Sequence, residues 1–490
     1  MNRNPLRDAL AAFADLLGPD RVCIDHLALA QVNAATFLTA ATAPAILKPI
    51  NREEVAACLR IANQHRVPVY PVSTGKNWGY GSAVAPRDGC ILLSLASLTA
   101  IVDFDAQTGH IRLEPGVSFQ QLHSYLQERG ARFQAPHTGS GAQTSVIGNI
   151  MERGIGKGLY EDMTAHVHAC EAVLANGEIL KTSQDASGPQ LLGLLPQSNL
   201  VIVVEITLQL EPAPHHSQLI TFPIDGGAAA LLRAVRGLHD FAMRAGPRSQ
   251  LAFLNDYRIT SQLTQFPHEH LDAGAALPRE WMQHCLAPWR GAQWVGACTV
   301  WADDIAELDW RRNRLTVALH EMGLVPQIET PIECLQLTLD DDGLRCAYWR
   351  KTFPMPRQPD LDRDRCGVIW VAPILPLSVP GLDTLIADLE TLTLAHGFEP
   401  AIALRTGRTA SMRLILGLFF DRDLPGADTR ALQCHQALHV MLQKANVQCY
   451  RHTLVDTAMF MDEGTRSVFT ALKTQIDPHG ILAPGRYGLS

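Results

Sequence analysis

The sequence predicts an α+β protein of two or more domains, organised around a glycine-rich loop that follows a short strand. At 490 residues the chain is too long for one compact hydrophobic core. Short strand-like runs and amphipathic helices succeed one another in an order typical of small sheets with packed helices. The segment Ser73–Ser82, S-T-G-K-N-W-G-Y-G-S, follows the β-like run Val67–Val72. Because glycine lets backbone N–H groups approach a bound anion closely, this loop is a candidate anion site.

The bulk composition excludes several classes of protein. The chain is 47% hydrophobic and 18% charged with a formal net charge of −8, and no basic block predicts a nucleic-acid or membrane surface. No apolar run approaches the roughly 20 residues needed to span a bilayer. Met1–Leu17 indicates an amphipathic helix rather than a signal peptide, because Asp8 and Asp15 interrupt its apolar face.

Cysteine and histidine usage gives no sign of a metal site. The 11 cysteines are scattered without a C-x-x-C pair, which favours reduced thiols in a cytoplasmic protein. The 19 histidines also lack a tight ligand pattern. His166 and His168 alternate as residues of a half-exposed strand do, so we predict no metal.

The first 210 residues predict short strands separated by capped helices. Asn51 with Glu54, and Ser118 with Gln121, are N-cap signals for two helices. Asn176-Gly177 is a strong hairpin turn. The expected strands are Ala45–Lys48, Val67–Val72, Cys90–Leu95, Ile101–Phe104, Ile111–Leu113, Cys170–Leu174, Ile179–Thr182 and Leu200–Leu210.

The glycine loop does not match the common nucleotide-binding patterns. A Walker A loop needs a glycine five residues before its Gly-Lys pair and a Ser or Thr after it, but Tyr70 and Asn77 occupy those places. A Rossmann G-x-G-x-x-G is also missing. If the loop binds a phosphate, it does so in another fold; otherwise it is an ordinary βα turn.

The loop resembles the pyrophosphate loop of the FAD-binding p-cresol methylhydroxylase type, within the vanillyl-alcohol oxidase family. That family reads S-x-G-R-N-x-G-Y-G, and Lys76 stands in place of its arginine. Ser145–Gly158, with four glycines, resembles a second family block, G-N-x-x-x-R-G-x-G, which leads into Y-G-D-H or Y-G-E-H. Here Tyr160, Glu161, Asp162 and Met163 follow, so the acid is retained as Asp162.

The resemblance continues to the end of the chain. Gln197–Val203 is similar to the family's Q-S-N-x-G-I-V, with Val201 replacing its glycine, and Ile476–Gly488 is very like the family terminus. It implies an FAD-binding domain at residues 1–214, a cap or substrate domain at 215–445, and a return to the FAD domain at 446–490. In the cap we expect helices Asp303–Met322 and Asp383–His396 and strands Val368–Pro373 and Leu414–Phe420.

The resemblance also assigns candidate site residues. Tyr80, Tyr450 and Arg451 match the family residues that surround a phenol oxygen, and Asp162 matches an acid beside the flavin. The expected FAD contacts are Ser73, Thr74, Gly75, Lys76, Asn77, Trp78, Ser145, Gly148, Asn149, Arg153, Gly154, Gly156, Ile202 and Arg486.

These residue types suit the oxidation of a phenol. A guanidinium with two O–H donors favours the anion of a phenol, whose pKa is about 10. The phenolate pushes electrons toward its para carbon, which lowers the barrier to hydride loss from the benzylic carbon and leaves a p-quinone methide. Asp162 would act as a base or stabilise charge near the flavin.

Two further expectations concern how FAD is attached to the protein and which acceptor reoxidises it. Many family members bind FAD covalently through a His or Tyr, but the loop here has no His and the matching cap stretch reads Ser411–Leu414. We therefore expect non-covalent FAD. The absence of a signal peptide favours oxygen or a soluble electron acceptor, and a homodimer stays open.

Two other functions remain open at the sequence level. Tyr450 and Arg451 could hold a carboxylate in an oxidoreductase acting on another alcohol, a hydroxy acid or an amine. The chain could also be a flavoprotein electron-transfer or binding subunit, whose mark would be a large exposed apolar patch.

Overall fold

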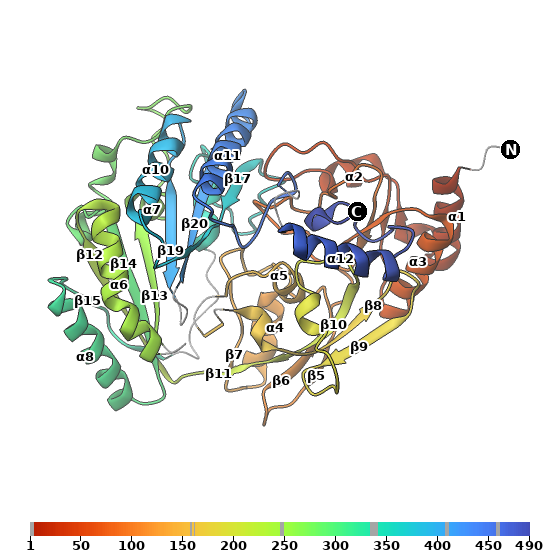
Figure 1. The fold of residues 1–490 in the computed structure, drawn as a ribbon, viewed down its shortest axis with the longest axis horizontal. Coiled ribbons are helices and arrows are strands. Elements are labelled where there is room, and N and C mark those ends of the chain that lie inside the picture. Colours follow the sequence, from red (N-terminus) through yellow and green to blue (C-terminus); the bar gives the residue numbers. More distant parts are fainter. Residues whose placement is uncertain are drawn as a thin grey trace.

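The computed structural model describes residues 4–156, 159–160, 162–245, 249–333, 342–406, 411–456 and 461–490. Figure 1 shows two lobes side by side, with the N-terminal third of the chain in the right lobe and the middle of the chain in the left. Helices and sheets occur in both lobes, so the architecture is α+β, as the sequence predicted.

The right lobe begins with a small sheet that carries the glycine loop. Its order is β1-β2-β4-β3, with β2 and β3 both parallel to β4. Apolar side chains of α1 and α3, such as Phe13 and Leu59, pack on it around Leu93. The elements are α1 (Pro5–Leu17), β1 (Val22–Cys23), α2 (His26–Val32), β2 (Ile46–Leu47), α3 (Arg52–His65), β3 (Val69–Val72) and β4 (Ile91–Ser94).

A second sheet in the same lobe supports the second glycine block. Its order is β5-β6-β10-β8-β9, and every pairing is antiparallel. Helices α4 and α5 pack their apolar residues into one core with it. The elements are β5 (Ile101–Phe104), β6 (His110–Leu113), α4 (Phe119–Glu128), β7 (Phe133–Gln134), α5 (Val146–Met151), β8 (Val167–Val173), β9 (Ile179–Ser183), β10 (Ile202–Gln209) and β11 (Glu211–Pro212).

The left lobe is built on a large antiparallel sheet. Its described strands follow the order β15-β12-β14-β13-β19-β20-β17, with β16 beside β12 and β18 beside β20. These strands are β12 (His216–Ile224), β13 (Ser249–Asn255), β14 (Trp294–Ala302), β15 (Gln327–Ile328), β16 (Ile332–Glu333), β17 (Cys366–Val371), β18 (Ile374–Pro376), β19 (Ala401–Thr406) and β20 (Ser411–Asp421).

Helices cover one face of this sheet. Four helices each contribute apolar residues to a core that they share with inward strand residues such as Leu251; examples are Leu231, Leu308, Ile386 and Leu438. The covering helices are α6 (Gly227–Ala245), α8 (Ile305–Glu321), α10 (Leu382–Ala395) and α11 (Ala427–Lys444); Figure 1 shows α8 at the lower left and α10 and α11 at the top of the left lobe. Two shorter helices, α7 (Asp256–Leu263) and α9 (Asp342–Tyr348), pack on the other face around Tyr348 and Val368.

Strand residues alternate between these two faces, as the period of two requires. On β13, Leu251 and Phe253 enter the helix-covered core, while Ala252 and Leu254 point to the opposite side. That opposite side faces the glycine loops of the right lobe, and this arrangement creates a cavity between the lobes.

The C-terminal tail returns to the right lobe. Helix α12 (Glu463–Ile476) crosses it in Figure 1, and Leu482 forms a parallel bridge with Val69 of the strand before the glycine loop. The buried Lys473 ammonium donates to the carbonyls of Asn199 and Leu482, each at 2.7 Å, and pairs with Asp477. The tail is therefore part of the sheet that carries the loop.

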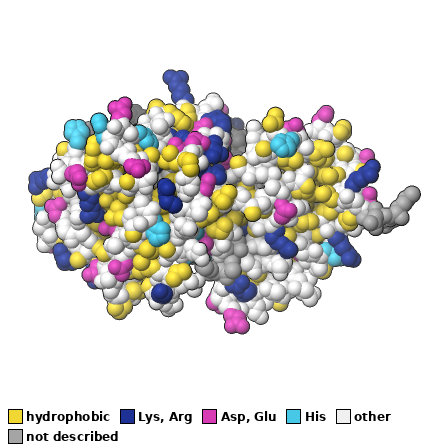
Figure 2. All heavy atoms as spheres, turned by 90° about the horizontal axis from the view of Figure 1, so that it is seen from above, with side chains coloured by type: hydrophobic (Ala, Val, Ile, Leu, Met, Phe, Trp, Pro, Cys, Tyr) yellow, Lys and Arg dark blue, Asp and Glu magenta, His cyan; other side chains and the backbone are white. Residues whose placement is uncertain are grey.

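Most of the predicted elements are confirmed, with ends that differ by a few residues. The N-caps at Asn51 and Ser118 accept backbone N–H bonds as expected. Within the described residues, none of the helices is long and apolar enough to cross a membrane, and every cysteine is a free thiol. Figure 2 shows Lys and Arg side chains scattered among Asp and Glu over one face of the molecule.

Candidate functional site

A cavity of about 350 Å³ lies between the two lobes. One side, which we call the loop wall, consists of residues 73–80, 145–156 and the tail residues 450, 451, 486 and 487. The other side, the sheet wall, consists of the open face of β13, β19 and β20, together with Trp370 and Arg258. The two walls differ in composition, and this difference determines which ligand groups each wall can bind.

The glycine loop presents a row of backbone donors to the cavity. In the described structure, the N–H groups of residues 74 to 78 have no acceptor. Gly79 has a φ of +79°, and a Cβ at that position would lie 2.1 Å from Trp370, so only glycine fits. Consecutive free N–H groups beside a cavity form a cradle for an anion such as a pyrophosphate.

The second glycine block is joined to the first. The Ser145 N–H donates to Thr74 Oγ1 at 3.1 Å, and Ser145 Oγ accepts from Gly148 N–H as the N-cap of α5. A Cβ on Gly154 would lie 2.3 Å from the Asn149 side chain. These contacts bring both glycine blocks to one wall.

A largely buried carboxylate organises the cations of the loop wall. Glu152 accepts two bonds from Arg486 at 2.7 and 2.8 Å, one from Tyr487 at 2.7 Å, and lies 3.6 Å from Arg451. Burial alone would raise the pKa of Glu152, but the guanidiniums of Arg486 and Arg451 hold it below its usual value. No motif in the sequence indicated a role for Glu152, although it lies inside the second glycine block.

The two tyrosines and the arginine predicted to meet a phenol do lie together. The Arg451 guanidinium stacks 3.9 Å from the centre of the Tyr80 ring, and it donates to Asn77 Oδ1 at 2.6 Å. Tyr450 lines the same wall, and Gln197 holds its carbonyl at 2.8 Å. Burial, and then the neighbouring Tyr450, raise the pKa of Tyr80 well above its ordinary value, so its hydroxyl stays protonated.

The sheet wall is mostly apolar and carries two arginines, Arg258 and Arg405. Arg258 on α7 is 8% exposed, and its guanidinium lies 5.6 Å from the ring centres of both Trp370 and Phe419. Its Nε and Nη1 atoms are buried without a hydrogen-bond partner, and no described carboxylate forms an ion pair with it. A buried guanidinium without an anion is costly, so this position favours an anionic ligand.

One aspartate fastens the two lobes together beside the cavity. Asp362 accepts from Trp78 Nε1 at 3.0 Å and from Ser82 Oγ at 2.8 Å, while Lys76 pairs with Asp360 at 3.4 Å. Burial raises the pKa of Asp362 to about 7. No motif in the sequence indicated this contact, because residues nearly three hundred positions apart form it.

All but two of the predicted site residues line the cavity. Arg153 is exposed at a φ of +51° and is not among the residues that line the cavity, so the structure offers no support for the predicted contact with FAD. Asp162 is exposed as well, because its carboxylate turns back to accept from the N–H and Oγ1 of Thr164 as a cap. The geometry gives no support to Asp162 as a base. Glu161 and Gly158 lie outside the described residues.

Comparisons with known proteins agree on the fold. Residues 43–183 match a family model described as FAD binding domain. The chain is 37% identical to the 1'-carboxy-chondrochloren decarboxylase of Chondromyces crocatus, over 99% of this chain and 98% of that protein. It is 24% identical to the flavoprotein subunit of 4-cresol dehydrogenase [hydroxylating] of Pseudomonas putida, over 98% and 95%. The crystal structure of p-cresol methylhydroxylase with substrate bound superposes with a TM-score of 0.88 at 21% identity, covering 100% and 98%.

The residues present fit FAD. Asn149 Oδ1 and Arg486 Nε are buried polar atoms of the loop wall without hydrogen-bond partners, beside the unsatisfied N–H groups of residues 74 to 78. A buried polar atom is normally paired, so this set implies a polar ligand with both donors and acceptors along the wall. The two glycine blocks and Arg486 would therefore hold the cofactor, while Tyr80, Tyr450, Arg451 and the sheet wall remain available to a substrate.

Proposed function

Because this chain belongs to the FAD-dependent oxidoreductases of the p-cresol methylhydroxylase type, we propose that it takes a hydride from the benzylic carbon of a para-substituted phenol. The observation that carries the proposal is the meeting of Tyr80, Tyr450 and Arg451 at the loop wall. The named activities of the Pseudomonas relative and of the superposed structure support a phenol of this kind. We further propose that residues 1–214 and 446–490 form the cofactor domain and 215–445 the cap.

The chain's own residues would prepare the phenol for this reaction. Bound FAD supplies the hydride acceptor. Arg451 is permanently charged, and its buried Nε–H still lacks an acceptor, so it can receive a phenolate oxygen. Tyr80 stays protonated and can donate to the same oxygen. Stabilising the phenolate raises electron density at the para carbon, and loss of hydride from the attached carbon then yields a p-quinone methide.

Anaerobic reduction of the bound flavin tests this function. A 4-alkylphenol should bleach the flavin absorbance, and the methyl ether of the same phenol should not, because it cannot form a phenolate. Equal bleaching by the ether would contradict the phenolate mechanism. No bleaching by any phenol would leave the electron-transfer or binding subunit as the better account.

We also propose that the FAD is held without a covalent bond. No histidine is among the described residues that line the cavity, and the tyrosines that line it, Tyr70, Tyr80, Tyr450 and Tyr487, all lie outside the proposed cap of residues 215–445. Acid precipitation should therefore release the flavin into the supernatant, where its absorbance is measured. A yellow pellet would contradict this proposal.

A second candidate is oxidative decarboxylation of a phenol that also carries a carboxylate. The buried Arg258 favours it, because an unpaired guanidinium on an apolar wall suits an anionic substituent of the substrate. The relative from Chondromyces crocatus, 37% identical, is named as a decarboxylase. Arg258 would bind the carboxylate at the sheet wall, while Arg451 would bind the phenolate at the loop wall.

The chemistry of this second candidate balances without a further reagent. The bound phenol would first lose its proton to water, and the resulting phenolate would lose a hydride from its benzylic carbon to become a quinone methide, with bound FAD as the acceptor. The bond from the adjacent carbon to the carboxylate then breaks, its electron pair forms a C=C bond, and the ring returns to a phenolate as CO2 departs. No protein base is needed in these steps, which suits a cavity that Asp162 does not line.

Product analysis separates the two candidates. With a 3-(4-hydroxyphenyl)propanoate-type substrate, decarboxylation predicts one CO2 and one vinylphenol per flavin reduced, and simple oxidation predicts neither. Arg258→Met should raise KM for the carboxylated phenol by about 10- to 100-fold and leave an alkylphenol unaffected. Arg357→Met on the exposed surface is the matched control. Equal KM values in both variants would remove Arg258 from substrate binding.

A further inference from the structure

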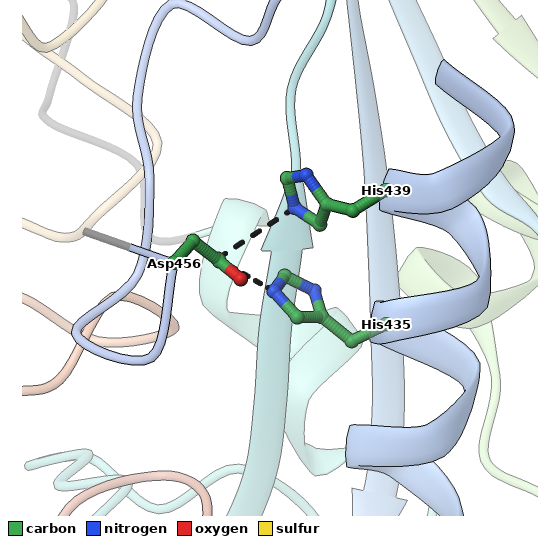
Figure 3. A group of neighbouring side chains, drawn as sticks. All are labelled: His435, His439 and Asp456. Carbon is green, nitrogen blue, oxygen red and sulfur yellow. Dashed lines mark hydrogen bonds and ion pairs between the residues drawn. The ribbon is translucent and has the colours of Figure 1, made fainter. Parts of the chain in front are cut away.

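Three buried side chains with metal-binding atoms meet outside the cavity. Figure 3 shows His435 and His439 on one side of α11 and Asp456 approaching them from the segment that follows Arg451. One ligand atom from each residue lies within 4.8 Å of the others, and all three side chains are buried. None of them takes part in the proposed reaction.

The arrangement of the histidines is that of a ligand pair. His435 and His439 are four residues apart, so an α-helix places them one above the other on one face. Their Nε2 atoms lie 2.7 and 3.6 Å from the same oxygen of Asp456. Both imidazoles therefore point at one carboxylate from the same side, and this oxygen would be one of three ligands around a small ion.

A hydrogen-bond network accounts for only part of this geometry. His435 Nε2 is at hydrogen-bond distance from Asp456, and Thr453 donates its N–H at 3.2 Å and its Oγ1–H at 2.7 Å to the same oxygen. His439 gains no hydrogen bond at 3.6 Å, yet its ring is turned toward the carboxylate. A cation between the three groups explains the orientation of His439 as well.

We propose that His435, His439 and Asp456 bind a Zn²⁺ ion. Two imidazoles and one carboxylate are typical zinc ligands, whereas Ca²⁺ and Mg²⁺ prefer oxygen ligands. Water, or the His452 ring whose centre lies 5.5 Å from that of His439, can complete a tetrahedral shell. The ion would also balance the buried charge of Asp456.

The position of the site gives it a structural role. Helix α11 belongs to the left lobe, and Asp456 lies five residues after Arg451 on the segment that crosses to the right lobe. A metal ion joining the helix to this segment would fix the backbone that carries Arg451. Because zinc binds the folded chain and its site does not exist in the unfolded one, it would stabilise the fold.

Metal analysis of the FAD-loaded protein tests the site without relying on activity. Elemental analysis after purification without chelator should give about one zinc per chain. After zinc removal and Co²⁺ addition, visible d–d absorption should indicate a tetrahedral nitrogen and oxygen shell. His435→Gln and His439→Gln should each abolish both signals, and His320→Gln, an exposed histidine on α8, should keep them.

The wild-type measurements also decide the case if the variants fail to fold. X-ray anomalous scattering at the zinc edge should place one peak between the three side chains. A wild-type protein that holds no zinc and shows no Co²⁺ spectrum would overturn the proposal, leaving a His-Asp hydrogen-bond network. Zinc retained by His439→Gln would overturn the ligand set.

Discussion

The two walls of the cavity hold their arginines in different ways. On the loop wall, Arg451 and Arg486 share the buried carboxylate of Glu152, so their charges are compensated within the protein. On the sheet wall, Arg258 has no ion-pair partner among the described residues. Arginines compensated in this way belong to the resting fold, so their positions are fixed before any substrate enters. An uncompensated cation suits a ligand that enters and leaves.

Removing the shared carboxylate should have the largest effect. Glu152→Gln leaves two buried guanidiniums without an anion, so we expect a loss of about 3–5 kcal/mol in the free energy of unfolding, together with loss of FAD. Denaturant unfolding monitored by circular dichroism measures the change. Glu321→Gln, at an exposed position, is the control and should change little. A stability equal to the parent protein's would show that the loop wall does not depend on Glu152.

Removing the guanidinium of Arg451 should slow flavin reduction on the order of 10²- to 10³-fold, because a preorganised donor to the phenolate is lost. Arg451→Lys keeps the charge but not the planar fork, so it should restore the rate only partly. Single-turnover reduction without oxygen measures both variants, with FAD content confirming that each is loaded. If the flavin of Arg451→Ala is reduced at the parent rate, the phenolate mechanism is wrong. An oxidoreductase acting on another alcohol, a hydroxy acid or an amine then becomes the better account.

The difference between the two walls also explains which site residues could be predicted from the sequence. The loop wall is encoded by continuous segments in which glycines, caps and a Tyr-Arg pair keep a fixed spacing, so its residues were found from the chain alone. Most of them do line the cavity. Arg153 and Asp162 do not line the cavity, because spacing does not show which way a side chain turns at a positive φ or at a cap.

The sheet wall could not be predicted in the same way. Its residues, such as Ala252, Leu254 and Ile415, are alternate positions of ordinary strands and form no motif. Only the structure shows that the buried guanidinium of Arg258 has no ion-pair partner among the described residues. His435 and His439 carried a usable signal, two histidines four residues apart, but their third partner comes from another segment.

The contact between the walls should respond to pH. Asp362 has a folded pKa of about 7, raised by burial from 3.8. The folded state therefore holds a proton that the unfolded state releases between about pH 4 and 7, and stability falls as pH rises through this window. Asp362→Asn keeps an acceptor for Trp78 and removes the ionisation.

We expect this variant to match the parent at pH 4 and to exceed its stability by about 4 kcal/mol at pH 8, because each pKa unit is worth roughly 1.4 kcal/mol. Thermal unfolding at several pH values measures the difference. Glu128→Gln, which alters an exposed carboxylate on α4, should not change the pH dependence. If the stabilities of Asp362→Asn and the parent differ by the same amount at every pH, Asp362 is already ionised in the folded protein.

The smallest effect on stability is expected at Arg258, although it is as buried as Arg451. Methionine can fill the space of the arginine stem against Trp370 and Phe419, and it removes a charge that no described residue compensates. Arg258→Met should therefore change the free energy of unfolding by less than about 1 kcal/mol or increase it. Denaturant unfolding beside Glu152→Gln gives the direct comparison. A loss as large as that of Glu152→Gln would mean that Arg258 is bound by the protein itself, and the two walls would then not differ in kind.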